Sequence, residues 1–515
     1  MFKYGIDRLS SGKVLSILRG ELEAVIAEEA AQKIESSHRI VMKTAMGDQA
    51  VYGINTGFGP LCDTIISKDD TSELQRKLLL SHAVGVGDPI DPELSKLMLI
   101  LKVHSLAQGY SGISMTVLNR IIWHIEHDVI PVVPEQGSVG ASGDLAPLAH
   151  LFLPLIGEGK VFYKGSISDV ESVLKKEGLT PLHLHPKAGL ALINGTQFIL
   201  AHAVRVVDRL YNCLSHADLI GSLMIEGLMG SQMPFHKSLH ETRPFPGNTH
   251  VAARIRSFLM DSEIGKSHEF CGKVQDPYSL RCMPQVHGSS RAAWLHLKES
   301  VETELNSVTD NPVIISDDLI ISGGSFHGQP LALPLDYACL AAAELGSISD
   351  RRTYLSLEGK YHGTPRLLMK DTGLNSGFMI LQYTAAALVS ENKGLCFPSS
   401  ADSIPTSLGQ EDHVSMGSIG GRKALRVIHN LENILAIELL CAAQAFDFRK
   451  PLRSSEFLDQ VHDRIREEIT FAVEDRIFSL DVQKAKQIIM DRSLLKLARN
   501  SYASFSDFDA QFESY

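Results

Sequence analysis

The stretch "GSVGASGDLAPLAH" (residues 137–150) places the three small residues Ala141, Ser142 and Gly143 directly before the expected start of a helix. Asp144 fits the N-cap position of that helix. Free backbone N–H groups and the positive end of a helix dipole favour electron-rich groups at such a start. Small residues there indicate a tight turn, or a site where the backbone itself reacts, because glycine permits close and unhindered approach.

Several well-known catalytic motifs are absent from the sequence. It contains no His-Glu-x-x-His zinc motif and no Gly-x-x-x-x-Gly-Lys-Ser/Thr phosphate loop. The segment "GVGDPI" (85–90) has only two of the three glycines of a dinucleotide-binding loop. Ser142 does not lie in the Gly-x-Ser-x-Gly turn of α/β-hydrolases. The sequence predicts no metal site.

The elements that must position the tripeptide are mainly helical. Asp91 is expected to cap a helix that begins at Pro92. Apolar residues with a helical period predict the helices of a central bundle. The segments concerned are 93–109, 118–127, 187–230, 290–307, 330–358, 376–394 and 420–446. The segment 187–230 contains no proline, so it forms either one long helix or two helices broken near Asn194-Gly195.

Two short stretches predict strands, at 160–168 and in a hairpin that joins 313–315 to 319–321. The fold class is therefore mainly α, with long central helices and a loop-rich N-terminal part. We expect residues 1–200 to carry the tripeptide and residues 201–515 to form the helical bundle, within one integrated catalytic unit.

Composition limits the partners of the 515-residue chain. It has 49 Lys and Arg residues against 60 Asp and Glu, a formal net charge of −11, which argues against nucleic acid or an anionic membrane as the main partner. The seven cysteines show no Cys-x-x-Cys spacing, which is typical of reduced thiols in the cytoplasm. The N-terminus has no apolar signal segment, and no uncharged apolar run reaches the roughly 18 residues of a membrane span. These features predict a cytoplasmic protein.

The string at 137–150 resembles the signature of the aromatic amino acid ammonia-lyase family. Seven further blocks resemble family motifs in the family's order, and the resemblance covers roughly residues 40 to 450. These blocks are "VYGINTGFGP" (51–60), "SHAVGVGDP" (81–89), "GLALINGTQ" (189–197), "VQDPYSLRCMPQVHG" (274–288), "NSVTDNP" (306–312), "SGGSFHGQP" (322–330) and "TSLGQEDHVSMG" (406–417).

The resemblance implies a bundle of long helices like that of fumarase and aspartase, assembled as a homotetramer whose active sites draw on more than one subunit. It also implies that Ala141, Ser142 and Gly143 cyclise and lose two waters to form 4-methylidene-imidazol-5-one (MIO), with no external cofactor. The Gly143 nitrogen attacks the Ala141 carbonyl carbon, and Ser142 becomes an exocyclic alkene. The product is an electrophile, which unmodified side chains do not supply.

The resemblance assigns roles to further residues. Tyr278 resembles the base that removes the β-proton, and Tyr52 is its alternate or an acid that assists the amine. The guanidinium of Arg281 suits the substrate carboxylate in two parallel hydrogen bonds. The other residues that resemble family positions at the substrate or the modified ring are Asn194, Gln275 and Phe326.

Substrate choice depends on His82 and Glu411. An imidazole ring has two nitrogens to satisfy, and a pocket that holds these two residues can pair both of them. This favours a small-molecule amino acid substrate, L-histidine, eliminated to trans-urocanate and ammonia in the first step of histidine degradation. Tyrosine and phenylalanine lyases, 2,3-aminomutases and a non-catalytic helical scaffold remain alternatives. "HGQP" (327–330) departs from the more usual Ala-Glu-Pro and also resembles relatives that act on tyrosine.

Overall fold

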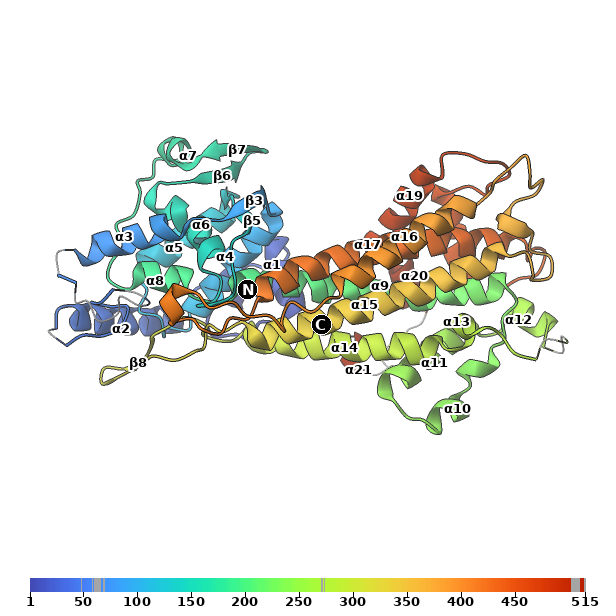
Figure 1. Cartoon of the computed structure of the whole chain (residues 1–515), viewed down its shortest axis with the longest axis horizontal. Helices are drawn as coiled ribbons and strands as arrows, with labels where there is room; N and C mark the ends of the chain where they lie inside the picture. Colours follow the sequence, from blue (N-terminus) through green and yellow to red (C-terminus); the bar gives the residue numbers. More distant parts are fainter. Residues whose placement is uncertain are drawn as a thin grey trace.

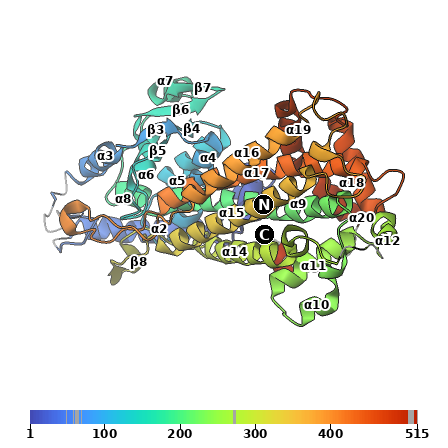
Figure 2. The ribbon, with the colours of Figure 1, turned by 45° about the vertical axis from the view of Figure 1, so that its right-hand side comes forward.

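The computed structural model describes residues 1–47, 49–57, 59, 66–67, 70–269, 272, 274–501 and 510–513. The molecule is elongated. The N-terminal elements gather at one end of a bundle of long helices, and the C-terminal helices cover the other end (Figure 1). The same arrangement is visible after a turn of 45° (Figure 2). The predicted mainly helical fold with long central helices is confirmed.

Five long helices form the bundle and contact one another along their lengths. They are α9 (Gln197–Gly227), α14 (Met283–Glu304), α15 (Gln329–Leu357), α16 (Met379–Leu395) and α17 (Gly417–Asp447). The helices α9 and α17 have 31 residues each, and 28 residues of α9 and 23 residues of α17 are buried. A helix that is buried on most sides needs neighbours on most sides, which explains why these two lie at the centre.

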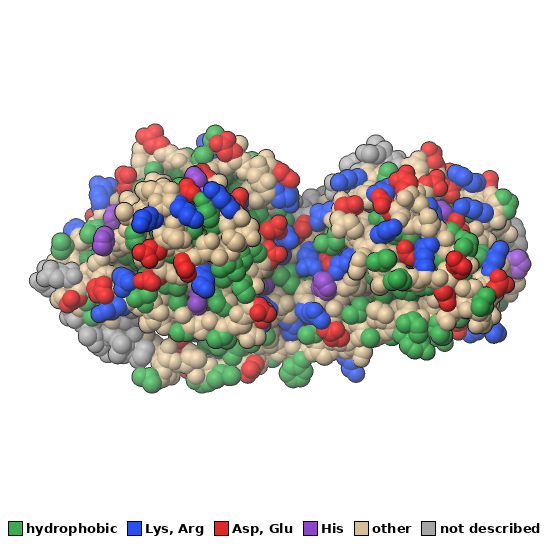
Figure 3. Space-filling view, turned by 90° about the horizontal axis from the view of Figure 1, so that it is seen from above, with side chains coloured by type: hydrophobic (Ala, Val, Ile, Leu, Met, Phe, Trp, Pro, Cys, Tyr) green, Lys and Arg blue, Asp and Glu red, His purple; other side chains and the backbone are tan. Residues whose placement is uncertain are grey.

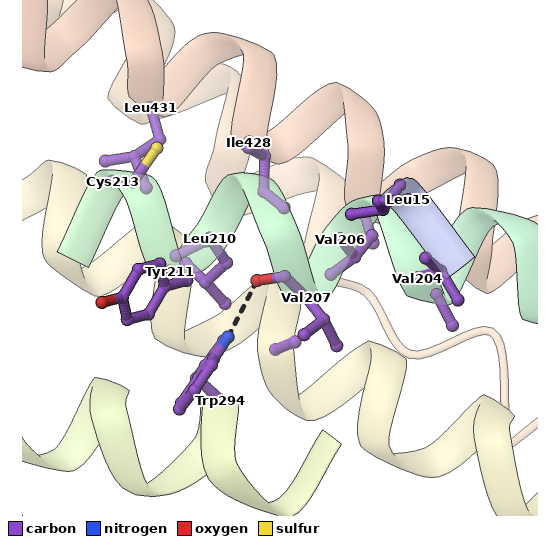
Figure 4. Close-up of a cluster of buried hydrophobic side chains, with 14 of the residues drawn as sticks. Leu15, Val204, Val206, Val207, Leu210, Tyr211, Cys213, Trp294, Ile428 and Leu431 are labelled. Carbon is purple, nitrogen blue, oxygen red and sulfur yellow. Dashed lines mark hydrogen bonds between the residues drawn. The ribbon is translucent and has the colours of Figure 1, made fainter. Parts of the chain in front are cut away.

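One part of this core lies where α9, α14, α17 and α1 (Ser11–Leu18) meet (Figure 4). Trp294 is fully buried there and donates from its indole Nε1 to the backbone oxygen of Val207 at 2.8 Å. Ile428 and Leu431 of α17 point towards α9, as Figure 4 shows. The indole N–H therefore has a partner inside an otherwise apolar cluster, as buried tryptophans require.

Shorter helices surround the bundle. In the N-terminal half they are α2 (Glu28–Ala45), α3 (Thr71–His82), α4 (Pro92–Leu106), α5 (Met115–Glu126), α6 (Leu145–Phe152), α7 (Val170–Lys176) and α8 (Ala188–Ile193). In the C-terminal half they are α10 (Lys237–Glu241), α11 (Pro246–Phe258), α12 (Glu263–Ser267), α13 (Tyr278–Arg281), α18 (Glu456–Glu468), α19 (Phe478–Met490), α20 (Ser493–Ser501) and α21 (Ala510–Glu513). Short 3-10 turns are η2 (Leu153–Ile156), η3 (Met233–Phe235), η4 (Arg366–Leu368) and η5 (Ser407–Gly409).

The strands form small separate sheets. The pairs are β1 (Phe2–Lys3) with β2 (Ala24–Val25), which is parallel, and β3 (Val86–Pro89) with β5 (Pro134–Gln136), which is antiparallel. A three-stranded antiparallel sheet joins β4 (Ile130–Pro131), β6 (Lys160–Tyr163) and β7 (Ser166–Asp169). The hairpin of β8 (Val313–Ser316) and β9 (Leu319–Ile321) confirms the prediction for 313–321, and β6 with β7 confirms the strand prediction at 160–168.

A local sequence signal located the start of α4 correctly. The Asp91 side chain accepts from the backbone N–H of Glu93 at 2.8 Å, as a helix cap should. The segment 187–230 forms two helices, α8 and α9, with the break at residues 194–196. The division of the chain at residue 200 stays a prediction. Helix α9 begins just before it and contacts the N-terminal helices α1 and α4 as well as the bundle.

Helix α15 is the one helix among the described residues that is long and apolar enough to cross a membrane, judged by length and composition alone. Two-thirds of its most apolar stretch is buried inside the protein, and it packs against α9, α14, α16 and α17. These contacts identify α15 as a core helix of the bundle.

The surface carries both signs of charge. On the face shown in Figure 3, acidic and basic side chains are interspersed along both ends of the molecule, and no continuous basic field is visible there. A continuous basic stripe is the usual surface of a protein that binds nucleic acid.

Candidate active site

A cavity of about 1120 Å³ lies at the N-terminal end of the bundle, between α3, α6, α8 and the loops that enter α15 and α17. Seven of the predicted site residues line it: Tyr52, His82, Ala141, Ser142, Asn194, Phe326 and Glu411. Gly143 is buried directly behind this lining. One chain therefore brings together residues that are up to about 360 positions apart in the sequence.

The tripeptide forms a tight turn. Ala141 and Gly143 face each other across an isolated β-bridge, so the chain doubles back at Ser142. Gly143 has a φ of +73°, and a Cβ atom added to it would stand 2.1 Å from the carbonyl oxygen of Gly195. Only glycine fits that position, because any side chain would collide with backbone. This geometry suits a backbone nitrogen at 143 that must approach the carbonyl carbon at 141.

The Asp144 carboxylate corrects one expectation. It occupies the N-cap position of α6, but its side chain makes no capping bond to that helix. Its Oδ2 instead accepts from the backbone N–H groups of Phe198 and Ile199 at 3.1 and 3.0 Å, in the first turn of α9. Thr196, at the N-cap of α9, bonds Glu304 and leaves these N–H groups to Asp144. Burial raises the pKa of the Asp144 carboxyl to about 7.

The start of α6 and the start of α9 therefore meet beside the tripeptide. Asp144 joins them through its side chain, and its backbone N–H donates to the oxygen of Gly195 at 2.8 Å. The positive ends of both helix dipoles lie at this point, which favours electron density gathered on the tripeptide.

Two polar side chains contact Ser142 directly. The Nδ2 group of Asn194 donates to the Ser142 carbonyl oxygen at 2.8 Å. The Ser142 hydroxyl donates to Oε1 of Glu411 at 2.9 Å, and the hydroxyls of Thr406 and Ser407 donate to Oε2 of the same carboxylate at 2.9 and 2.7 Å. The Oδ1 atom of Asn194 is buried without a hydrogen-bond partner in the described part of the chain. Ser142 is thus held at its carbonyl and at its hydroxyl.

His82 ends α3 at the wall of the cavity, and its Nδ1 lies 3.0 Å from the Ser81 hydroxyl. Burial lowers the pKa of His82, while a backbone hydrogen bond to Leu78 and the nearby Glu411 oppose that shift. The ring is therefore neutral near pH 7, with one nitrogen that donates and one that accepts. A neutral ring can pair with a polar ring of a bound molecule.

Three predicted residues do not reach the cavity within one chain. Tyr278 and Arg281 belong to α13, and Gln275 lies three residues before its start. Figure 1 shows α13 at the opposite end of the bundle from α3 and α8. They form a cluster of their own. Arg281 lies over the Tyr278 ring at 4.6 Å and donates from Nη2 to Oε1 of Gln275 at 3.0 Å. The Tyr278 residue is 71% exposed.

The sequence analysis missed two histidines of the cavity. His327 and His413 line it, with parallel rings whose centroids lie 5.9 Å apart. Both belong to family-like strings, "SGGSFHGQP" and "GQEDHVSMG", in which only Phe326 and Glu411 were singled out. Their positions beside Phe326 and Glu411 in those strings could have identified both histidines as cavity residues. No group of three or more His, Cys, Asp or Glu side chains suited to a metal ion occurs among the residues that the structure describes.

Comparison with known proteins gives a consistent result. The family model described as aromatic amino acid lyase matches residues 9–467. The chain is 44% identical over 498 residues to a histidine ammonia-lyase of Myxococcus xanthus (strain DK1622), a match that covers 96% of this chain and 98% of that protein. The crystal structure of histidine ammonia-lyase from Trypanosoma cruzi aligns with a TM-score of 0.89 at 38% identity, over 97% of this chain and 95% of that one.

A tyrosine aminomutase from Streptomyces globisporus is equally similar in fold. Its crystal structure aligns with a TM-score of 0.90 at 32% identity, over 96% of this chain and 97% of that one. The family match, which extends over most of the chain, agrees with the tripeptide turn and the cavity around it. The chain belongs to the aromatic amino acid lyase family.

Proposed function

We propose that the protein eliminates ammonia from L-histidine to give trans-urocanate, the first step of histidine degradation. The observation that carries the proposal is the tight Ala141-Ser142-Gly143 turn, which faces a cavity that also holds His82 and Glu411. The 44% identity to a protein named histidine ammonia-lyase supports the choice of amino acid. As a member of this family the protein is a carbon–nitrogen lyase.

The residues around the tripeptide suit the MIO group that the family uses. The turn brings the Gly143 nitrogen towards the Ala141 carbonyl, and the Gly143 Cα lies where no side chain fits. MIO supplies an electrophile that withdraws electrons from the substrate and makes elimination of the amine feasible. Asn194 holds the carbonyl oxygen of residue 142, and Asp144 fixes the two helix starts beside it. No external cofactor is part of the proposal.

Selection of histidine follows from the two polar groups on the cavity wall. In the unmodified chain the Ser142 hydroxyl occupies Oε1 of Glu411. Dehydration removes that hydroxyl and leaves Oε1 to accept an imidazole N–H, while neutral His82 offers a second polar contact. A phenyl ring would leave both groups unpaired and desolvated, at a cost of about 1–3 kcal/mol for each group.

We further propose that the protein is a cytoplasmic homotetramer and that a neighbouring subunit completes each site. Tyr278, Arg281 and Gln275 lie far from the cavity of their own chain and form a cluster at the surface. In the neighbouring site Tyr278 would remove the β-proton and Arg281 would bind the carboxylate. Tyr52 and Phe326 complete the wall on the cavity's own side.

Exposed apolar side chains on the bundle support the assembly. Leu333, Tyr337 and Leu340 of α15 are 56%, 48% and 53% exposed, and their spacing places them on one face of the helix. A stripe of this kind on a long helix is typical of a surface that another chain covers.

A tyrosine substrate or an aminomutase outcome is the second candidate. The fold likeness to a tyrosine aminomutase and the "HGQP" segment (327–330) favour it. Incubation of the purified protein with histidine, tyrosine and phenylalanine in separate reactions tests both candidates. The ultraviolet spectrum of the product identifies which arylacrylate forms, and chromatography detects a β-amino acid. Urocanate from histidine alone supports the proposal; a β-amino acid, or turnover of tyrosine without histidine, contradicts it.

A further inference from the structure

Lys102 is a buried lysine close to the tripeptide, and the proposed reaction assigns no role to it. It lies on α4, its residue is 1% exposed, and it is surrounded by apolar neighbours in the chain. Its Nζ donates to the backbone oxygen of Asn194 at 2.6 Å and reaches Oε1 of Gln197 at 3.4 Å. Among the described residues it forms no ion pair. The nearby Lys187, by contrast, is paired with Asp310 at 2.8 Å.

An ammonium group buried without a carboxylate is costly. Removal of a charge from water costs several kcal/mol unless a partner compensates for it. Burial accordingly lowers the pKa of Lys102 to about 7; Lys187 adds to that shift, and Asp310 and Asp144 oppose it. A neutral or apolar side chain at this position would avoid the desolvation cost. The lysine therefore makes interactions here that an apolar core residue cannot make.

The contacts of Lys102 indicate what that is. Asn194 follows the last residue of α8, where a helix leaves carbonyl oxygens unpaired and favours a positive charge. Gln197 is the first residue of α9. The ammonium group therefore contacts the first residue of the break, Asn194, and the first residue of α9, Gln197.

The residues of this break contact the tripeptide directly. Asn194 donates from its side chain to the Ser142 carbonyl, and the Gly195 oxygen accepts from the backbone of Asp144. The Gly195 backbone also limits the space at Gly143. Any movement of residues 194–197 would therefore shift both the donor to residue 142 and the wall behind residue 143.

We propose that Lys102 is a positioning residue for the electrophilic centre: its ammonium holds residues 194–197 in the form that places the Asn194 amide on the carbonyl oxygen of residue 142. Lys102 does not itself line the cavity and, within the described part of the chain, makes no hydrogen bond to the tripeptide, so it acts through Asn194 and Gln197. The role rests on the proposed function, because it concerns formation and use of the group made from residues 141–143.

The test compares Lys102→Met with Lys96→Met. Methionine is one atom shorter than lysine, keeps most of the length of the side chain and removes every donor. Lys96 lies on the same helix, and its ammonium pairs with Asp128 at the surface, so this control removes a lysine from α4 without touching the break. For each protein, intact mass gives the fraction of chains that have lost two waters. The melting temperature, kcat and KM are measured on the same samples.

We expect Lys102→Met to contain fewer dehydrated chains than the wild type. Its kcat for each dehydrated chain should fall about 10- to 100-fold, with little change in KM, because a small displacement of a positioned group has an effect of that size. Lys96→Met should match the wild type. Lys102→Gln retains a donor, so its dehydrated fraction and its kcat should lie between those of Lys102→Met and the wild type. It also serves as the test variant if Lys102→Met does not fold.

Two outcomes overturn the role of Lys102. One is full dehydration with unchanged kcat in Lys102→Met or Lys102→Gln. The other is a lower melting temperature with unchanged kcat for each dehydrated chain, which identifies a residue that only stabilises the fold. A wild-type chain that retains both waters contradicts the proposed function and the role of Lys102 together. A dehydrated wild type beside an unaffected variant contradicts the role of Lys102 alone.

Discussion

Gly143 lies against Gly195 so closely that a Cβ atom on Gly143 would stand 2.1 Å from the Gly195 carbonyl oxygen. The two residues also form an isolated parallel bridge, and Gly143 has a φ of +73°. The backbone of the tripeptide is thus in direct contact with the backbone of the break between α8 and α9. The contact explains why glycine stands at 143 independently of its part in any reaction.

Gly143→Ala tests this contact. We expect the variant to retain both waters at residues 141–143 and to lose nearly all activity, because the added methyl group forces the turn away from Gly195. Gly165→Ala is the matched control: Gly165 has a φ of +81°, but nothing lies within 4 Å of an added Cβ. That substitution should lower the free energy of unfolding by only about 1–2 kcal/mol, the cost of an alanine in the left-handed conformation. Mass spectrometry and turnover of histidine check both variants; a dehydrated, active Gly143→Ala would contradict the account.

His82→Leu tests the choice of substrate. Loss of the polar ring should lower kcat/KM for histidine about 10- to 100-fold, since an unpaired imidazole nitrogen costs about 1–3 kcal/mol. Phenylalanine provides the internal comparison, because its apolar ring should be accepted no worse than by the wild type. Steady-state kinetics with both amino acids measure the ratio. An unchanged preference for histidine would remove His82 from substrate selection.

Arg281→Lys tests the proposed role of Arg281 in binding the substrate carboxylate. The variant should raise KM about tenfold with a smaller effect on kcat, because lysine cannot make two parallel hydrogen bonds to a carboxylate. Arg243→Lys is the control, since Arg243 is exposed and lies over the ring of Phe245 at 5.1 Å, much as Arg281 lies over Tyr278. If both variants keep the wild-type KM, another group binds the carboxylate.

Local patterns in the sequence predicted much of the fold. The central helices and the β8–β9 hairpin follow from the period of apolar residues, and the cap at Asp91 follows from one residue and its neighbours. Asp144 occupies the predicted N-cap position of α6, but its side chain bonds the first turn of α9, and those partners lie 54 and 55 residues further along the chain. No local pattern contains that information.

The candidate site was predictable to a similar extent. The family-like strings identified the residues that line the cavity, except that the string with Gln275, Tyr278 and Arg281 does not contribute to it within one chain. The strings did not reveal that Tyr278 lies at the other end, since distance within the fold depends on the length and direction of α9 and α14. Lys102 was missed because the sequence of an apolar helix that carries two lysines, Lys96 and Lys102, does not show what either side chain contacts.

Glu513 on α21 makes stability depend on pH. Burial raises the pKa of its carboxyl, but the charge of Arg254 and a hydrogen bond from His250 outweigh burial and lower the pKa from 4.5 to about 2. A lowered pKa means that the stabilisation is present above pH 4.5 and is lost as the pH falls towards 2. Glu513→Gln should reduce the free energy of unfolding at pH 7 by about 1–3 kcal/mol, and the difference from wild type should shrink near pH 3.

Urea denaturation at the two pH values measures this difference. Glu474→Gln, which changes an exposed carboxylate, is the control and should have no effect at either pH. Equal stability of Glu513→Gln and the wild type at pH 7 would show that the C-terminal helix is not held by this ion pair.

The most direct test of the account is the mass of the proteolytic peptide that contains residues 141–143, taken from active enzyme. We predict that this peptide is lighter than its sequence by two water molecules, with the loss confined to the tripeptide. The same peptide from the inactive Ser142→Ala variant should not show the loss of two waters, because alanine has no hydroxyl to lose. Full mass in the peptide from protein that turns over histidine would contradict the central claim.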